Sequence, residues 1–181
     1  YRSARTHAVA PDGVRVPVRW DANMDEAGRV DPVFMARVRA VVTQALDAGL
    51  PVVCIGNLTL GGTGKTPVTA AARAYFTASG ARTASLSRGY RGSIVGPTQV
   101  GAQNTAAEVG DEPLMLAATG EAWISKDRPA GAKAMKEAGV QIIVMDDGLQ
   151  NPALRKDLRI AVVDGLRGFG NGLCIPAGPL R

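Results

Sequence analysis

Short apolar runs alternate along most of this chain with longer, amphipathic stretches. The apolar runs are rich in β-branched residues, which is typical of buried parallel strands. The stretches between them are rich in alanine, favour helix and tend to end at a glycine. Because strands alternate with helices, the pattern predicts an α/β fold in which a parallel sheet carries helices on both faces.

This regular pattern begins at residue 51. It predicts strands over 51–56, 82–86, 122–125, 141–145 and 160–163, and helices over 67–76, 111–119 and 127–138. Residues 97–107 have no clear period, and we expect them to be irregular. Parallel strands end at one edge of their sheet, so the polar residues that follow these strands should converge there.

The first fifty residues have a different character. Residues 14–20 alternate like a strand, but Pro17 restricts that strand to a sheet edge. Residues 33–48 have apolar positions at near-helical spacing, which predicts an amphipathic helix. We therefore divide the chain into an N-terminal segment, 1–50, and a core, 51–181.

The two ends of the chain suggest a larger protein. The sequence starts at Tyr1 rather than at a methionine, and it stops at Arg181, directly after a run rich in proline and glycine. We therefore expect the core to be a piece of a longer chain.

The most informative stretch joins the first core strand to the first core helix. It consists of Thr59, Leu60, Gly61, Gly62, Thr63, Gly64, Lys65 and Thr66. A glycine loop followed by Lys-Thr, between a strand and a helix, is the context of a phosphate-binding loop. Its backbone N–H groups converge on phosphate oxygens, and the helix N-terminus adds partial positive charge. Lys65 would reach the β- and γ-phosphates of a nucleotide, and the Thr66 hydroxyl would bind Mg²⁺.

This loop departs from the usual pattern at one position, since Thr59 stands where a glycine is expected. Two other interpretations therefore stay open. In the first, the stretch is a glycine-rich turn that is followed by Lys-Thr only by chance. In the second, it is a degenerate loop that no longer binds nucleotide.

Carboxylates that could hold Mg²⁺ follow the predicted strands. Asp146 and Asp147 come after a strongly apolar run, in the form of a Walker B strand, although a helix N-cap is the alternative for Asp146. A second acidic pair, Asp111–Glu112, stands at the start of the helix predicted over 111–119, where capping is again an alternative. Arg88 lies among glycines at a strand end, where it would contact phosphate or lie in a solvated loop.

Composition narrows the range of functions. The 181-residue chain is 46% hydrophobic and 20% charged, with a formal net charge of +5. This charge suits an anionic partner. The aromatic fraction of 4% argues against a stacking surface for single-stranded nucleic acid. Moreover, the sequence holds no run of apolar residues long enough to span a membrane, and no signal peptide.

The histidine and cysteine content excludes other site chemistries. The single histidine, His7, argues against a Ser-His-Asp triad and histidine-rich metal sites. Cys54 and Cys174 are far apart in the sequence and form no CxxC, so a structural zinc site is not expected. We expect Cys54 to be a core residue and the protein to be cytoplasmic.

Five motifs occur in an order that resembles the tetraacyldisaccharide 4'-kinase family. They are Gly56–Pro67, Ser87–Tyr90, Val109–Pro113, Asp146–Gln150 and Pro176–Arg181. The resemblance covers roughly residues 50–181, and it accounts for Thr59 because the family's loop is similar to this variant. It implies a phosphate-loop kinase that transfers the ATP γ-phosphate to the 4'-hydroxyl of tetraacyldisaccharide 1-phosphate, which yields lipid IVA.

The resemblance also assigns roles to residues. It implies ATP and Mg²⁺ as cofactors, with residues 59–66 at the phosphates and with Thr66, Asp146 and Glu112 at the metal. The catalytic set would be Asp111 as the base together with Lys65, Asp146 and Asp147. The residues on the substrate side would be Arg88, Gln150 and Arg181.

The resemblance further implies partners and a location. The acceptor would be the lipid A disaccharide precursor, reached at the inner face of the bacterial inner membrane by a peripheral enzyme. Neither nucleic acid nor an obligate protein partner is expected.

Three features depart from the family. Asn151 stands where many members have a histidine, and residues 1–50 lack the family's membrane-seeking helix. In the family a second, C-terminal lobe would follow residue 181, and this lobe supplies a histidine partner for the base.

Two rival functions remain. A phosphate-loop GTPase needs an Asn-Lys-x-Asp element, which is missing, and related ATPases place a lysine where this chain has Leu60. A nucleotide-binding module without catalysis is the second rival.

Overall fold

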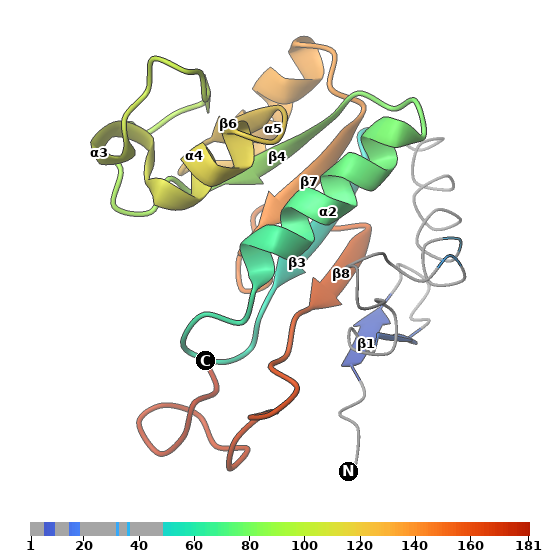
Figure 1. Cartoon of the computed structure of the whole chain (residues 1–181), viewed down its shortest axis with the longest axis vertical. Helices are drawn as coiled ribbons and strands as arrows, with labels where there is room; N and C mark the ends of the chain where they lie inside the picture. Colours follow the sequence, from blue (N-terminus) through green and yellow to red (C-terminus); the bar gives the residue numbers. More distant parts are fainter. Residues whose placement is uncertain (1–5, 10–14, 19–31, 33–35, 37–48) are drawn as a thin grey trace.

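The computed structural model describes residues 6–9, 15–18, 32, 36 and 49–181 (Figure 1). Its strands are β1 (Thr6–Val9), β2 (Arg15–Val18), β3 (Val52–Gly56), β4 (Thr83–Ser87), β5 (Thr98–Gln99), β6 (Ala122–Ile124), β7 (Ile142–Asp146) and β8 (Leu158–Ala161). Its helices are α2 (Lys65–Ala78), α3 (Ala106–Val109), α4 (Asp111–Ala117) and α5 (Arg128–Glu137).

All the named strands belong to one sheet, in the order β2-β1-β8-β3-β7-β4-β6-β5. The central strands β8, β3, β7, β4 and β6 are parallel. Strands β1 and β2 extend one edge in the antiparallel sense, and β5 does so at the other edge. The predicted parallel sheet is therefore confirmed for the core, with short antiparallel additions at both edges.

Helices cover both faces of this sheet, as the sequence predicted. Val53 and Ile55 of β3 pack against Val68 and Phe76 of α2, which crosses the sheet in Figure 1. The alternate residues of β3 belong to the core of the opposite face, which is closed by α5 and by the segment after β7. Since successive strand side chains point to opposite faces, a fully apolar β3 serves both layers.

Two parts of the core differ from the prediction. Residues 97–107, expected to be irregular, include β5 and the start of α3, which a capping box of Thr105 and Glu108 fixes. Strand β8 begins two residues before the predicted strand over 160–163. Leu158 is buried and Arg159 exposed, so this strand alternates where the prediction required a continuous apolar run.

The N-terminal part is described only in short pieces. Strand β2 lies at the outer edge of the sheet and confirms the edge strand predicted over 14–20. Strand β1 was not predicted. The helix predicted over 33–48 lies, apart from Ala36, outside the described residues. Within the described ranges, no helix has the length and apolar character needed to cross a membrane.

The C-terminal end of the chain lies beside the loop between β3 and α2 (Figure 1). The backbone N–H of Leu60 donates to the carbonyl of Pro179 at 2.8 Å, and that of Arg181 donates to Leu58 at 2.9 Å. The predicted phosphate loop is thus flanked by the last residues of the sequence. This arrangement places Arg181 at the carboxyl edge of the sheet.

Candidate active site

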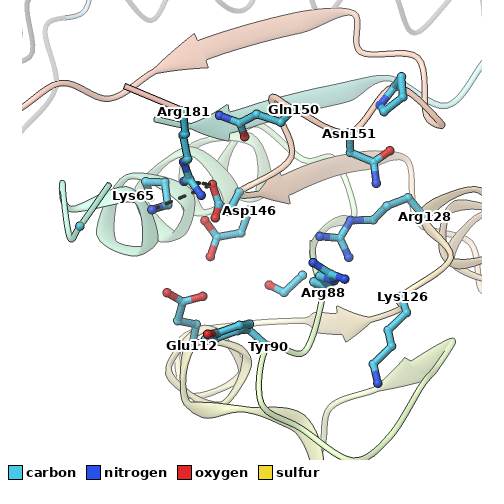
Figure 2. Close-up of a pocket in the computed structure, with 14 residues that line it drawn as sticks. Lys65, Arg88, Tyr90, Glu112, Lys126, Arg128, Asp146, Gln150, Asn151 and Arg181 are labelled. Carbon is cyan, nitrogen blue, oxygen red and sulfur yellow. Dashed lines mark hydrogen bonds and ion pairs between the residues drawn. The ribbon is translucent and has the colours of Figure 1, made fainter. Parts of the chain in front are cut away.

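A pocket of about 760 Å³ opens at the carboxyl edge of the parallel strands. The predicted site residues that line it are Gly61, Lys65, Arg88, Glu112, Asp146, Asp147, Gln150 and Arg181. It is also lined by Ser87, Tyr90, Lys126, Arg128, Asn151 and Pro152. Figure 2 shows Lys65, Asp146 and Arg181 grouped at one side and the cations Arg88, Lys126 and Arg128 at the other.

The glycine loop has the geometry of an anion cradle. Gly61 and Gly64 have φ values of 102° and 79°, in the left-handed region that favours glycine. Gly64 is the N-cap of α2. Among the described residues, no side chain caps this helix and no acidic residue lies in its first turn, so the first N–H groups of α2 are open to an anion. Among the described residues, none is a hydrogen-bond partner of the buried Thr63 hydroxyl. A bound phosphate would satisfy these donors.

Lys65 takes part in a chain of charges at the mouth of this loop. Its Nζ lies 4.0 Å from Oδ1 of Asp147, which also accepts a hydrogen bond from Nη2 of Arg181 at 2.9 Å. Asp147 has a φ of 51°, which is uncommon for a residue with a side chain and recurs at functional sites. The predicted residues Lys65, Asp147 and Arg181 are therefore brought into one cluster.

Asp146 is the buried carboxylate of the pocket. Its side chain accepts a hydrogen bond from the Thr69 hydroxyl at 3.1 Å, and the residue is only 2% exposed. Burial and, next, the nearby Glu112 carboxylate raise the pKa of Asp146 to about 6, although the Thr69 hydrogen bond opposes the shift. Asp146 ends β7 and no helix follows it before β8, so the helix-cap interpretation is wrong.

The donor set of this pocket fits Mg²⁺. Thr66 lies in the first turn of α2, next to Lys65, and Glu112 and Asp146 both line the pocket. Among the described residues, no group of three or more His, Cys, Asp or Glu is placed to enclose a metal ion. Mg²⁺ bound with nucleotide commonly uses one or two carboxylates and completes its shell with phosphate and water.

The acidic pair at the start of α4 is divided between the pocket and the surface. Glu112 lines the pocket, whereas Asp111 is exposed and outside the lining. The N-cap of α4 is Gly110, and no side chain of the described residues caps this helix, so capping does not explain Asp111. Gly110 has a φ of 90°, and a Cβ there would lie 2.5 Å from the Tyr90 carbonyl oxygen. This glycine lets the helix start close to the pocket wall.

The cationic side of the pocket contains Arg128, which the sequence analysis missed, and Ser87, which it named in a motif without giving it a role. Arg128 is 3% exposed at the start of α5; it donates to the Ser125 carbonyl, but its Nε finds no hydrogen-bond partner in the part of the chain that the structure describes. Burial lowers the pKa of Arg128, and the neighbouring Arg88 lowers it further. The buried Ser87 hydroxyl likewise has no hydrogen-bond partner within the described ranges. Ser87 is the last residue of β4, and Arg128 comes after β6, so both lie at the strand ends where Arg88 was predicted, and both offer donors to an anionic or sugar group.

The segment after β7 brings Gln150 and Asn151 to the pocket. Nε2 of Gln150 donates to the carbonyl of Asn57 at 2.8 Å, which ties this segment to β3. Asn151 stands where the resemblance leads us to expect a histidine. Its side-chain Oδ1 accepts a hydrogen bond from the Ala153 N–H at 2.8 Å, and its backbone carbonyl accepts one from the Lys156 ammonium. Asn151 thus lines the pocket while its side chain holds the local turn.

Comparisons with known proteins agree with this geometry. A family model described as tetraacyldisaccharide-1-P 4'-kinase matches residues 30–181. The tetraacyldisaccharide 4'-kinase of Methylobacterium radiotolerans is 51% identical over 175 residues, which is 93% of this chain and 54% of the relative. That of Hyphomonas neptunium is 46% identical over 183 residues, or 93% of this chain and 55% of the relative.

A solved structure shows the same fold. LpxK from Aquifex aeolicus, determined in complex with ATP, has a TM-score of 0.63 and 27% identity, over 80% of this chain and 50% of that one. The phosphate-loop kinase fold predicted from the sequence is thereby confirmed. The present chain spans about half the length of the curated relatives it matches.

Proposed function

Because this chain belongs to the tetraacyldisaccharide-1-P 4'-kinase family, we propose that it provides the ATP site of a kinase. That kinase phosphorylates the 4'-hydroxyl of a tetraacyldisaccharide 1-phosphate and so forms lipid IVA. The observation that carries this proposal is the pocket in which Lys65, Asp146 and the glycine loop meet. The activity for which the relatives are named gives the reaction class, and the pocket provides residues suited to it.

ATP would lie with its phosphates on the glycine loop. The open N–H groups of α2, the buried Thr63 hydroxyl and the Lys65 ammonium would contact phosphate oxygens. Lys65 would exchange its 4.0 Å ion pair with Asp147 for a phosphate. Thr66, Asp146 and Glu112 would hold Mg²⁺, which neutralises the charge that develops on the transferred phosphate. Asp147 would support the site through Arg181.

The acceptor would enter from the side of the pocket that faces α4 and the cations. Phosphoryl transfer depends mainly on positioning and on electrostatic stabilisation, so the acceptor hydroxyl must lie in line with the γ-phosphate. Asp111 would take the proton from this hydroxyl. Arg88, Gln150 and Arg181 would contact the acceptor, because all three line the pocket.

The substrate would be met at a membrane surface. Its acyl chains stay in the bilayer, because each buried CH₂ contributes about 0.8 kcal/mol. The net charge of +5 would favour the anionic inner face of the inner membrane, as a peripheral contact. The proposal includes no nucleic acid and no obligate protein partner.

The test is phosphate transfer from γ-labelled ATP to the tetraacyldisaccharide 1-phosphate in detergent micelles. We expect transfer by the wild-type chain, and a rate lower by about 10²–10⁴-fold in Asp111→Ala, because a general base acts in the transition state. ATP affinity should be unchanged in that variant. Glu137→Ala, an exposed acid on α5, serves as the control.

The other outcomes separate the rivals. ATP binding without transfer would favour the non-catalytic nucleotide-binding module. Equal use of GTP, with hydrolysis but no acceptor, would favour the NTPase. An unchanged rate in Asp111→Ala would remove the proposed base.

A further inference from the structure

Asn57 is a buried polar residue to which the proposed function gives no role. It follows β3 directly and is 0% exposed. Its Nδ2 donates to the carbonyl oxygens of Thr59 and Gly61, at 2.8 and 3.2 Å. Its Oδ1 accepts from Nη2 of Arg181, and its backbone carbonyl accepts from Gln150. One side chain therefore holds the first turn of the glycine loop and the last residue of the sequence.

The pattern of partners suits the amide of an asparagine. Two carbonyl oxygens need donors, and the Arg181 guanidinium needs an acceptor, so the amide satisfies both with its two ends. An aspartate has the same shape, but it would set a second oxygen against the carbonyls of Thr59 and Gly61. Because Asn57 is fully buried, no water replaces the lost donors without rearrangement.

The contact with Arg181 links Asn57 to the charged residues of the pocket. Arg181 also donates to Asp147 at 2.9 Å, and Asp147 is the ion-pair partner of Lys65. The backbones of Leu58 and Leu60 bind the same C-terminal segment. Loop, lysine and C-terminal segment are thus joined at Asn57.

We propose that Asn57 is a positioning residue that holds the phosphate loop in its nucleotide-binding conformation and couples it to Arg181. A loop rich in glycine loses much conformational entropy when it is ordered around a ligand. If the Asn57 side chain orders the loop before the ligand binds, part of that entropy cost no longer opposes binding. This inference rests on the proposed function, because it takes the nucleotide phosphates as the ligand of the loop.

The test compares MgATP affinity by calorimetry in the wild type and in Asn57→Asp and Asn57→Ala. Asn57→Asp loses the two hydrogen bonds to the loop carbonyls, and Asn57→Ala also loses the one from Arg181, so each variant should bind about five- to hundredfold more weakly. The matched control is Asn104→Ala, which removes an asparagine that accepts from the Gly101 N–H at 2.9 Å in a loop outside the pocket lining. Affinity should not change in this control.

A second readout follows the loop itself. Amide hydrogen exchange over residues 58–64 should become faster in both Asn57 variants and stay unchanged in Asn104→Ala, at matched melting temperatures. Folded Asn57 variants with wild-type affinity and wild-type exchange would overturn the inference. If the wild type binds no nucleotide, the proposed function fails, while the exchange rates still decide whether Asn57 orders the loop.

Arg181→Gln covers the case in which the Asn57 variants do not fold. Its side chain is partly exposed, so the core is not disturbed. Weaker MgATP binding together with faster exchange over residues 58–61 is expected, because the loop loses its tie to the C-terminal segment. Unchanged values for both would contradict the coupling.

Discussion

Replacing Arg73 with methionine should loosen the wall of the pocket from inside the core. Arg73 lies on α2 and is 2% exposed. Its guanidinium donates to four acceptors: Ser85 Oγ at 3.1 Å, the Glu121 carbonyl at 3.0 Å, the Leu116 carbonyl at 2.8 Å and Thr119 Oγ1 at 2.6 Å. These acceptors belong to β4, to the end of α4 and to the turn before β6. Arg73 therefore fixes α4, whose first turn carries Glu112.

The expected loss of stability follows from this network. Hydrogen bonds to a charged donor contribute about 1.5–3 kcal/mol each, but much of that sum offsets the cost of burying the cation, which is several kcal/mol. Burial also lowers the pKa of Arg73, because removal from water disfavours the charged guanidinium. Methionine restores apolar volume and leaves the acceptors without a donor. We expect a net destabilisation of about 3 kcal/mol.

Urea unfolding followed by circular dichroism measures this change, and thermal unfolding should shift by about 6–12 °C for a chain of this size. The control is Arg155→Met, since Arg155 is 78% exposed in its side chain and its ion pair with Asp157 is 3.6 Å long. We expect less than about 1 kcal/mol there. If both variants lost equally little free energy of unfolding, the conclusion that the Arg73 hydrogen bonds stabilise the fold would be refuted.

Three further predictions concern the site and the thiols. Gly110→Ala should destabilise the chain by about 2 kcal/mol or more in urea unfolding, because of its positive φ and the 2.5 Å approach to the Tyr90 carbonyl; an unchanged midpoint would contradict this. Asp146→Asn should weaken ATP binding in calorimetry more with Mg²⁺ than with a chelator, because a hard cation prefers an anionic oxygen; equal losses would speak against a metal role. In maleimide labelling at neutral pH, the exposed Cys174 should react rapidly and Cys54 only after unfolding. Burial raises the pKa of Cys54 to about 11, so this thiol stays protonated as the pH rises from 7 to 9; two rapid labels would contradict its burial.

The sequence predicted the centre of the fold better than its margins. Strand β3 is buried on both faces, so its apolar run is visible without any tertiary knowledge. The start of β8 was missed because Arg159 faces outward in an alternating strand. Strand β1 pairs with β2 and β8 at the edge, and a short polar sequence gives no sign of such pairing.

The site was predictable where its chemistry is local in sequence. The glycine loop with Lys65 carries its function in consecutive residues, and Asp146 marks the end of an apolar strand. Asn57 and Arg128 were missed because their roles depend on partners brought together by folding: Arg181 for the first and the pocket wall for the second. The roles of the individual site residues, including Asp111 as the base, stay predictions.

The central claim is that the glycine loop and Lys65 bind the phosphates of ATP, and calorimetric titration with MgATP tests it most directly. We expect one site per chain in the wild type. Lys65→Met should bind at least about tenfold more weakly, because a charged contact to phosphate is lost. Lys133→Met, which removes an exposed lysine on α5, should bind like the wild type. Equal affinity in all three proteins, or no binding by the wild type, would contradict the account.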